Sequence, residues 1–504
     1  MTLQFSQRLS FVMAAALAAG CLVGCDSAGG GSTAKVPTDL PDLPAPDQPE
    51  PPSDNDPLTL PAQCSELPAC NPDVQVDPAG AALLVTDPAI LANFTLERVL
   101  AQILQFQGVD TPPTEMMQRL FDTMNTSADG KFADVFHCDS PGNPDTQNGG
   151  GDTFLCPRAE GALASSESFF TEGDPDSFFP VALVNRFDLT PVDGSRCGQY
   201  RIIYAKHSGL TDPNDRVFLI FEAALANPLP GCLGACRPVA ELWQGLQGRS
   251  SADIASQLDT FFFTGIAGFK PAVHPLHYGF GAVSQGYGGS EGGQIRVSMH
   301  MEDPWDMREM RVELDPSSKD PSFRPTTVKN NPPALMFDPQ AMGSAGMGPF
   351  FREQFVWSNL PTLAGKELKS VQMFNFPDLN GVESTLTGDK KNDYFAAAVS
   401  TGDMTFVDAI QAQIDATGLN AGCPVDDPFD AEAAIHRANV LSCAGCHAPK
   451  NFLGEDRSIG CGLTWPDSIG QSHVTEKGQV SPALKDVFLP HRADVLQTFL
   501  QACD

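Results

Sequence analysis

The sequence predicts an α+β protein of several domains, with an N-terminal helical hairpin, a central antiparallel β-rich region and a C-terminal all-α domain. Apolar residues recur at helical spacing through 81–126, and the period shifts toward two between 180 and 315. Helical spacing returns in 427–449 and 490–504. With 504 residues and 42% hydrophobic side chains, the chain is long enough for about two to four domains.

Residues 1–24 have the pattern of a signal peptide, in which Arg8 precedes an apolar run that is too short to span a bilayer. The run ends in LVGC at 22–25, which resembles the lipobox of bacterial lipoproteins. The resemblance implies that Cys25 is diacylated and anchors the protein in a membrane of the cell envelope, at the periplasmic face or the outer surface. A competing box ends at Cys21, but it begins with Ala where the family prefers Leu, so we favour Cys25. Ordinary secretion without an anchor is the alternative.

A tether follows the anchor. Eight prolines lie between positions 37 and 57, interleaved with Asp and Glu. Such a segment is extended and semi-rigid and cannot bury a core. We therefore expect residues 25–63 to form the lipid anchor and a Pro/Asp-rich tether.

Residues 64–175 predict a helical region with a disulfide-closed loop. Two stretches of helical apolar spacing within 81–126 flank a Pro-Pro break at 112–113, which indicates a helical hairpin. The loop that follows is rich in Gly, Asp, Asn and Ser, and we expect Cys138 and Cys156 to close it.

Residues 176–420 predict a β-rich domain. Four segments have the pattern of antiparallel strands and are separated by Gly, Pro and Asp turns, namely 201–205, 216–225, 294–301 and 307–314. Two short helices, at 237–247 and 252–263, interrupt them. The sequence contains no nucleophile elbow, phosphate loop or dinucleotide fingerprint, so its pattern assigns this domain no role.

The charge of the chain bears on its partners. The 62 acidic and 31 basic side chains give a formal net charge of −31, which becomes −32 when Arg8 leaves with the signal peptide. This charge repels phosphate backbones, which excludes nucleic acid as a partner. It favours encounters with basic redox partner proteins.

The most informative motif is CAGCH at 443–447, which follows a helical pattern that begins at an Asp. Cys-x-x-Cys-His is the attachment motif of c-type haem. Its thiols lie one helical turn apart, so that each can add to a vinyl group, and its histidine is placed under the iron. Cys443 and Cys446 would thus bind one haem c covalently, with His447 as proximal iron ligand. A disulfide between the two cysteines would leave His447 unexplained, and a zinc knuckle lacks a second Cys/His pair downstream.

The motif and its leading helix resemble the cytochrome c family. The resemblance covers residues 423–504 and implies that 421–504 forms an all-α, cytochrome c-like haem domain. That family closes its fold with a C-terminal amphipathic helix, and 490–504 has a proline at its start and an apolar stripe. We expect this helix to cover the haem or the first helix of the domain.

The distal side of the iron departs from the family pattern. Single-haem cytochromes c place a Met after the motif, but the last Met of this chain, Met404, lies before it. His473 is our favoured distal ligand because loops after the motif commonly carry that ligand. His491 is the alternative, and an open iron is the third possibility.

The remaining cysteines give an independent indication of the compartment. Ten of the 14 cysteines remain after the signal peptide, the anchor and the haem motif are taken into account. This even number can form disulfides in an oxidising compartment such as the periplasm. We expect near neighbours to pair, namely Cys64 with Cys70, Cys138 with Cys156, and Cys232 with Cys236.

Three functions are compatible with these features. The leading interpretation is single-electron transfer by a tethered monohaem protein. The first alternative is a haem-containing redox enzyme or ligand-binding protein with an active site in the N-terminal region. The sequence identifies no catalytic residue for such a site. The second is a surface binding or structural lipoprotein in which the haem is incidental.

Overall fold

The computed structural model describes residues 71–140, 154–191, 194–279, 293–314, 321–343, 346–374, 379–386 and 392–502. The chain divides into two units, 1–55 and 56–504, and all described residues belong to the second. The predicted signal peptide, Cys25, the predicted tether, Cys64 and Cys70 lie outside the described residues. Across the described ranges, no helix has both the length and the apolar character needed to cross a membrane.

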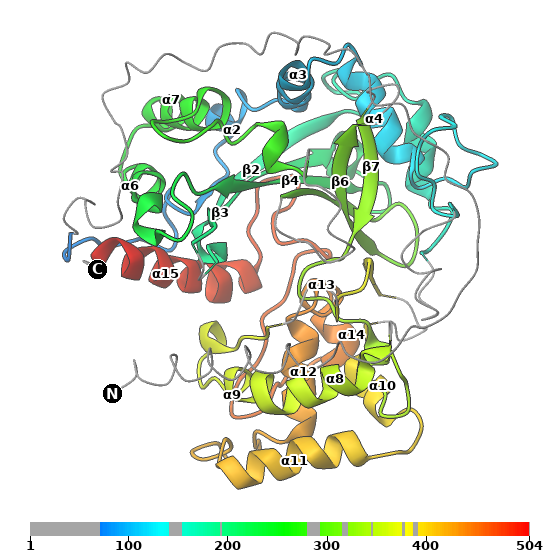
Figure 1. Ribbon diagram of the computed structural model, residues 1–504, viewed down its shortest axis with the longest axis vertical. Helices are drawn as coiled ribbons and strands as arrows, with labels where there is room; N and C mark the ends of the chain where they lie inside the picture. The colour runs from blue at the N-terminus through cyan, green and yellow to red at the C-terminus, as the bar shows by residue number, and fades with distance from the viewer. Residues whose placement is uncertain are drawn as a thin grey trace, which may run out of the picture. The chain divides into compact units, whose positions relative to one another are not determined.

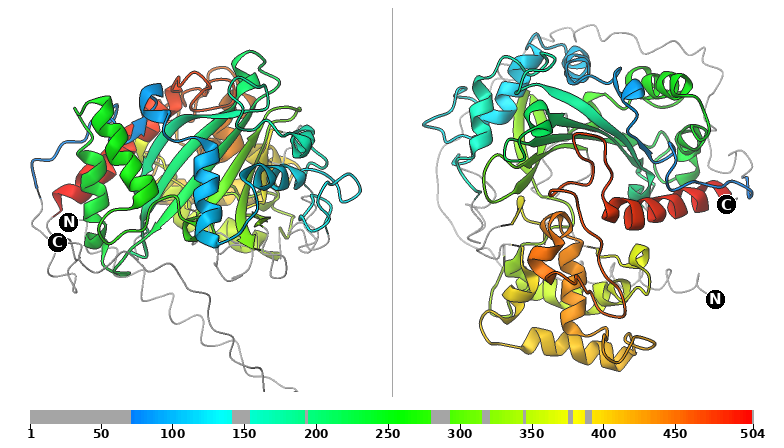
Figure 2. Two further views of the ribbon diagram at one scale, coloured as in Figure 1. Left: turned by 90° about the horizontal axis from the view of Figure 1, so that it is seen from above. Right: turned by 180° about the vertical axis from the view of Figure 1, so that it is seen from behind.

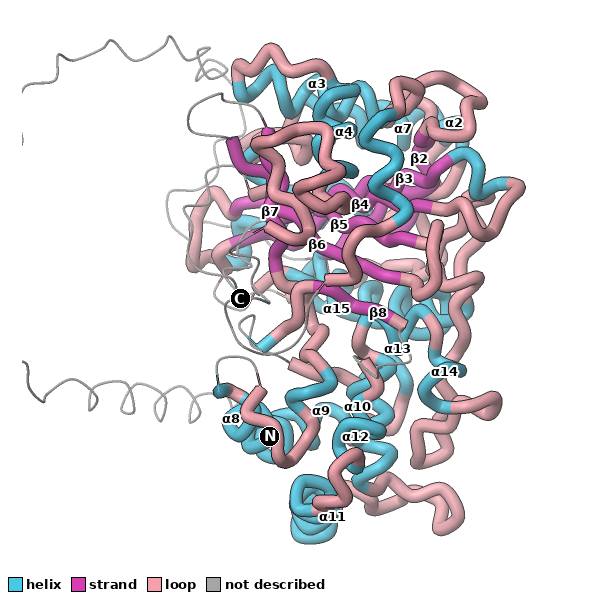
Figure 3. Tube along the Cα trace, turned by 90° about the vertical axis from the view of Figure 1, so that its right-hand side faces the viewer, coloured by secondary structure: helices cyan, strands magenta, loops and turns pink. Residues whose placement is uncertain are grey.

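An eight-stranded antiparallel sheet forms the centre of the described fold, which is therefore α+β (Figures 1 and 3). Seven strands are hydrogen-bonded to one another in sequence order, and the eighth pairs with β6. The strands are β1 (Leu84–Val85), β2 (Phe178–Arg186), β3 (Arg196–Lys206), β4 (Val217–Ala226), β5 (Gln294–Met299), β6 (Asp306–Leu314), β7 (Pro321–Thr326) and β8 (Glu383–Thr385). Such an order lets short connections join neighbouring strands.

The four predicted strands are confirmed as β3, β4, β5 and β6. The sequence pattern missed β2, whose side chains from Val181 to Asn185 are all buried. A strand that is covered on both faces lacks the alternation of apolar and polar residues by which strands are recognised. The long β2 therefore carries no period-two signal.

Helices cover one face of the sheet, where α2, α3, α4 and α7 lie (Figures 1 and 3). The helices of this half of the chain are α2 (Pro88–Leu91), α3 (Leu96–Gln107), α4 (Pro113–Asp122), α6 (Arg237–Gln244) and α7 (Ser251–Asp259). Thr95 caps α3 by accepting from the backbone of Arg98, and Gly108 ends it at a φ of 64°. Pro113 begins α4, as expected for the first helical position. The main hydrophobic core lies between these helices and the sheet.

A second hydrophobic core lies among helices on the other side of the sheet (Figures 1 and 3). These helices are α8 (Gly348–Gln354), α9 (Leu360–Leu363), α10 (Tyr394–Val399), α11 (Thr405–Thr417) and α12 (Ala431–Val440). Two short helices, α13 (Cys443–His447) and α14 (Pro449–Leu453), follow α12 directly. The chain thus passes from the second core to the sheet through the predicted haem motif.

The predicted C-terminal helix is present as α15 (Leu489–Gln501). Its buried residues Leu496 and Leu500 belong to the main core of the sheet, and the ring of Phe499 lies 4.6 Å from that of Phe187. Arg237 of α6 donates to the backbone oxygen of Leu500 at 3.1 Å. Figure 2 shows α15 against the sheet, apart from α11 and α12. Residues 421–504 therefore contribute to more than one core.

Three disulfides join described cysteines, Cys138–Cys156, Cys197–Cys236 and Cys423–Cys461. The first confirms the predicted closure of the loop. The predicted pair Cys232–Cys236 is wrong, because Cys236 bonds to Cys197 and Cys232 is engaged in another disulfide. Cys197 lies on β3, and the packing of α6 beside this strand brings Cys236 to it, a proximity that sequence spacing does not reveal.

Candidate functional site

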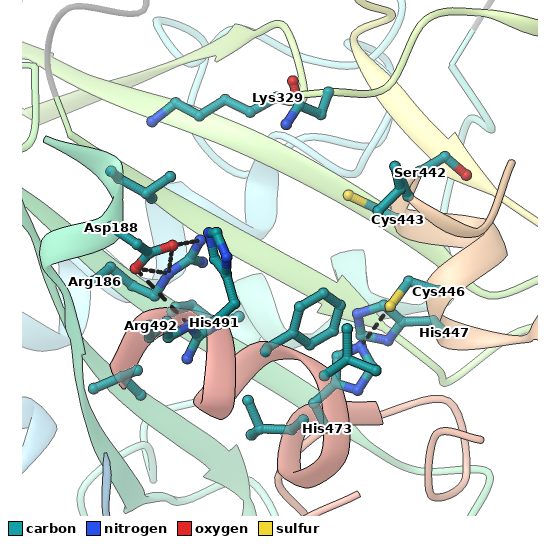
Figure 4. Close-up of a pocket in the computed structure, with 18 of the residues that line it drawn as sticks. Arg186, Asp188, Lys329, Ser442, Cys443, Cys446, His447, His473, His491 and Arg492 are labelled. Carbon is teal, nitrogen blue, oxygen red and sulfur yellow. Dashed lines mark hydrogen bonds and ion pairs between the residues drawn. The ribbon is translucent and has the colours of Figure 1, made fainter. Parts of the chain in front are cut away.

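A cavity of about 740 Å³ lies between the sheet, α13 and α15 (Figure 4). Its volume falls within the range of about 300–1,000 Å³ that is typical of cofactor and ligand sites. All five residues of the predicted haem site line it, namely Cys443, Cys446, His447, His473 and His491. Trp465 and Phe488 supply part of its apolar wall.

The short helix α13 presents the two cysteines to this cavity. Ser442 caps the helix by accepting a hydrogen bond of 3.0 Å from the backbone of Gly445. Gly445 itself packs against the end of α12, where a Cβ atom would lie 1.9 Å from the backbone oxygen of Asn439. Only glycine allows the turn between Cys443 and Cys446 to approach α12 this closely.

Neither thiol of the motif forms a disulfide, so the alternative of a Cys443–Cys446 bridge is not realised. Cys443 is half-buried and Cys446 is buried. Desolvation raises the pKa of Cys443 to about 11 and raises the pKa of Cys446 well above its ordinary value. Both sulfurs are therefore protonated at neutral pH, and the cavity receives two S–H groups rather than thiolates.

His447 is held in one tautomer. Its Nδ1 atom lies 2.6 Å from the backbone oxygen of Gln471, which can only accept, so Nδ1 carries the proton and Nε2 does not. The indole of Trp305 stacks on the imidazole, with ring centroids 4.8 Å apart and planes inclined by 24°. Desolvation lowers the pKa of His447 to about 4, so the ring is neutral at pH 7. A neutral imidazole oriented through Nδ1 is the form that binds a metal through Nε2.

His473 lies against both Cys446 and His447. Its Nε2 atom is 3.2 Å from the Sγ atom of Cys446, and its Nδ1 atom is 2.9 Å from the hydroxyl of Ser481. Desolvation lowers the pKa of His473 well below its ordinary value, so the protonated thiol can donate to Nε2. The centroids of the two imidazoles are 4.6 Å apart, which puts the rings in contact. An iron ion fits between them only if one ring shifts.

His491 enters the cavity from the first turn of α15, within a different cluster of side chains. Figure 4 shows it beside Asp188, Arg186 and Arg492 rather than beside the cysteines. Desolvation lowers the pKa of His491, and the charge of Asp188 opposes this shift. The structure thus brings both candidate distal ligands to one cavity, but only His473 contacts the motif.

The sheet forms a cationic wall of the cavity. Successive strand residues point to opposite faces, so Arg201 faces the cavity while its neighbour Ile202 belongs to the main core. In register with Arg201 lies Glu222, and its Oε1 atom is 3.0 Å from Nη1 of the arginine. Arg296 of β5 reaches Glu222 at 3.5 Å and also pairs with Glu309 of β6.

Three more cations line this side of the cavity, namely Arg186 on β2, Lys329 after β7 and Arg492 on α15. Arg186 donates to Asp188 at 2.8 Å, and Arg492 lies 3.9 Å from the same carboxylate. Burial alone would raise the pKa of Asp188, but the charges of Arg186 and Arg492 outweigh it and lower that pKa to about 2. Within the described residues, the buried amino group of Lys329 has no hydrogen-bond partner. Desolvation lowers the pKa of Lys329 to about 8 and that of Arg201 to about 9.

Sequence analysis did not identify this cationic wall. A signal was present, because Arg201 and Arg296 stand inside segments that were predicted to be strands and alternate with apolar residues. Alternation of this kind is usually produced by a solvent-exposed face. In this fold α13 and α15 cover that face, and the arginines become the wall of a cavity.

Metal-ligating side chains are otherwise dispersed. In the portions of the chain that the structure describes, no group of three or more His, Cys, Asp or Glu residues could hold a metal ion. A haem iron takes only its axial ligands from the protein.

In comparisons with known proteins, no family model matches this sequence, and no curated protein or solved structure matches it.

Proposed function

We propose that this protein is an envelope lipoprotein, anchored through Cys25, that carries one covalent haem c on Cys443 and Cys446 and transfers single electrons. The haem would supply a one-electron couple at its iron. The observation that carries the proposal is the set of groups facing one cavity of cofactor size, namely two unbridged thiols and the unprotonated Nε2 of His447. Residues 421–504 would form the cytochrome c-like part, and basic redox proteins would be its partners.

The residues of α13 fit a covalent haem. Each thiol would add across one vinyl group, its sulfur bonding to one carbon and its hydrogen passing to the other, so the reaction needs neither an oxidant nor a leaving group. Both cysteines are free of disulfides and line the cavity, as this addition requires. Gln471 and Trp305 orient His447 as the proximal ligand.

We propose His473 as the distal ligand. Its Nε2 atom is within 3.2 Å of the Cys446 sulfur, and formation of the thioether removes the S–H group that can donate to this nitrogen. The hydroxyl of Ser481 lies 2.9 Å from Nδ1, and when Nδ1 donates to this hydroxyl, Nε2 is unprotonated and available for the iron. His473 and His447 must separate from their present contact to ligate one iron. A His/His iron has a lower potential than a His/Met iron.

Covalent attachment is tested by haem staining on a denaturing gel after expression in a host with the attachment machinery. Wild type is expected to stain, and the Cys443→Ser/Cys446→Ser variant is expected to lose all staining. The matched control is Cys138→Ser/Cys156→Ser, which also removes two cysteines but breaks a disulfide outside the cavity. Staining that persists in the first variant, or is absent from wild type, contradicts the proposal.

A ligand-binding haem protein is the second candidate, and the contact between His473 and His447 favours it if neither ring moves. The iron would then keep an open position inside a cavity of about 740 Å³. Carbon monoxide added to the reduced protein separates the two functions. An unchanged low-spin spectrum supports electron transfer, whereas rapid formation of a carbonyl complex supports ligand chemistry.

A further inference from the structure

The cavity wall formed by the sheet, the segment after β7 and the start of α15 carries an excess of positive charge. Its five cations are Arg186, Arg201, Arg296, Lys329 and Arg492, and the carboxylates that pair with them are Asp188, Glu222 and Glu309. Five cations against three carboxylates leave two positive charges unmatched among the described residues. This excess stands out in a chain whose formal net charge is −31.

Lys329 and Arg201 are the two cations of this wall that offer a buried donor atom without a partner among the described residues. The Nζ atom of Lys329 and the Nε atom of Arg201 are buried and have no hydrogen-bond partner within the described part of the chain. Arg201 is only 9% exposed, so solvent contributes little to its neutralisation. Arg201 keeps its ion pair with Glu222 through Nη1, so only its Nε donor is open, whereas the ammonium of Lys329 makes no hydrogen bond within the described residues. Burying a donor without a hydrogen-bond partner is unfavourable, and desolvation is the main cause of the lowered pKa values of both side chains.

We propose that this wall is a subsite for carboxylate groups and that it holds the two propionates of the haem. The inference rests on the proposed function, which puts the haem in the same cavity. The two surplus positive charges of the wall equal the two propionates in charge, and Lys329 and Arg201, which carry the unpartnered donor atoms, line the cavity that Cys443 and Cys446 also line. A planar guanidinium and an ammonium are the donors that proteins use for carboxylates.

A free dicarboxylate offers the same chemistry as the propionates, and a small anionic molecule beside the haem could occupy the wall instead. The two sources differ in one respect. Propionates would fill the subsite permanently once the haem is attached, whereas a free dicarboxylate would still bind to the haem-loaded protein. Succinate serves as the probe for this second source.

The first experiment uses the haem-loaded protein and the substitution Lys329→Met, which removes the charge without leaving a hydrogen-bond partner unpaired. The propionate bending bands in the resonance Raman spectrum are expected to shift. The midpoint potential is expected to fall, because a cation near the haem favours the reduced state. Lys329→Arg should restore both properties. Lys369→Met is the control, because Lys369 lines the same cavity but donates to Asp494 at 2.7 Å; it should leave the Raman bands unchanged.

The second experiment measures thermal stabilisation by succinate. The haem-free Cys443→Ser/Cys446→Ser chain should be stabilised, since its wall is open, and Lys329→Met in that background should abolish the effect. The haem-loaded wild type should not respond if propionates fill the wall, and a response that depends on Lys329 would assign the wall to a free dicarboxylate. If Lys329→Met leaves the propionate bands unchanged and succinate stabilises neither the haem-loaded nor the haem-free protein, the proposal of a carboxylate subsite is contradicted. Absence of haem from wild type would end the proposed function but would leave the succinate test of the wall intact.

Discussion

The Sγ atom of Cys446 and the Nε2 atom of His473 lie 3.2 Å apart, so the cysteine proposed to bind the haem contacts the histidine proposed to ligate its iron. While the thiol is intact, its S–H group can occupy Nε2. Thioether formation at Cys446 would remove that hydrogen, so covalent attachment and distal ligation would be coupled through one contact. His491 lies in the Asp188 cluster instead, and this difference separates the two candidates experimentally.

Replacement of His473 by Ala is expected to convert the oxidised haem protein from a low-spin to a high-spin absorption spectrum, because the proposed distal nitrogen is lost. His491→Ala is the matched control and should retain the low-spin spectrum. A spin change with His491→Ala alone would reverse the assignment of the distal ligand. If neither variant changes spin, the iron is open or has a ligand from another part of the chain.

Asp188→Asn is expected to destabilise the protein in a pH-dependent manner. Because the folded-state pKa of Asp188 is lowered from 3.8 to about 2, its ionisation stabilises the fold above about pH 4, and this contribution disappears as the pH falls toward 2. The shift corresponds to about 2 kcal/mol in the free energy of unfolding. Urea unfolding of both proteins at pH 6 and pH 2 measures the difference.

The control for this measurement is Asp494→Asn, which removes an exposed partner of Lys369 and should cost about 0.5 kcal/mol or less at either pH. If Asp188→Asn lowers the free energy of unfolding by the same amount at pH 6 and at pH 2, the electrostatic explanation is contradicted.

Gly445→Ala is expected to disturb the haem motif without changing its cysteines. The new Cβ would lie 1.9 Å from the backbone oxygen of Asn439, so α13 or the end of α12 must move. Overpacking of this kind costs about 1–3 kcal/mol, and haem staining per mole of protein should fall. Gly108→Ala is the comparison, because its Cβ meets no atom within 4 Å and only the φ of 64° is strained. That variant should lose about 1 kcal/mol, because alanine is strained at a left-handed φ, and should keep full staining. Equal staining in both variants would show that the approach of α13 to α12 is not needed for attachment.

Cys25→Ser is expected to move the protein out of the detergent-extracted membrane fraction or to leave the precursor unprocessed, since the sulfur that would carry the lipid is lost. Cys21→Ser should leave membrane association unchanged. Immunoblots of membrane and soluble fractions measure the outcome. The opposite pattern would assign the anchor to Cys21.

Several elements were predictable because their signals are local. The strands β3 to β6 carry their alternation within single segments, and Pro113, Pro490 and Asp430 stand at or next to the starts of α4, α15 and α12. The motif CAGCH needs only one helical turn to bring its two thiols to one side. The disulfide Cys138–Cys156 was predictable for the same reason, since the two cysteines lie at the two ends of a single loop.

Contacts between distant segments were beyond the sequence pattern. Near-neighbour spacing paired Cys236 with Cys232, whereas the packing of α6 beside β3 pairs it with Cys197. The pattern of α15 predicts an amphipathic helix but does not say which surface its apolar stripe meets, and Leu496 and Leu500 pack into the main core of the sheet.

The sequence by itself therefore determined that the chain contains both helices and strands, and it determined that Cys443, Cys446 and His447 lie together within one helical turn. These features depend on residues that are close together in the sequence. Tertiary structure alone decided what surrounds that motif. Sheet register aligned Arg201 with Glu222, the placement of α13 and α15 turned this face of the sheet into a cavity wall, and Lys329 came into the same cavity from a distant segment. A charge in a half-exposed strand and a charge in a cavity wall have the same sequence pattern, and only the packing of distant residues onto the strand distinguishes them.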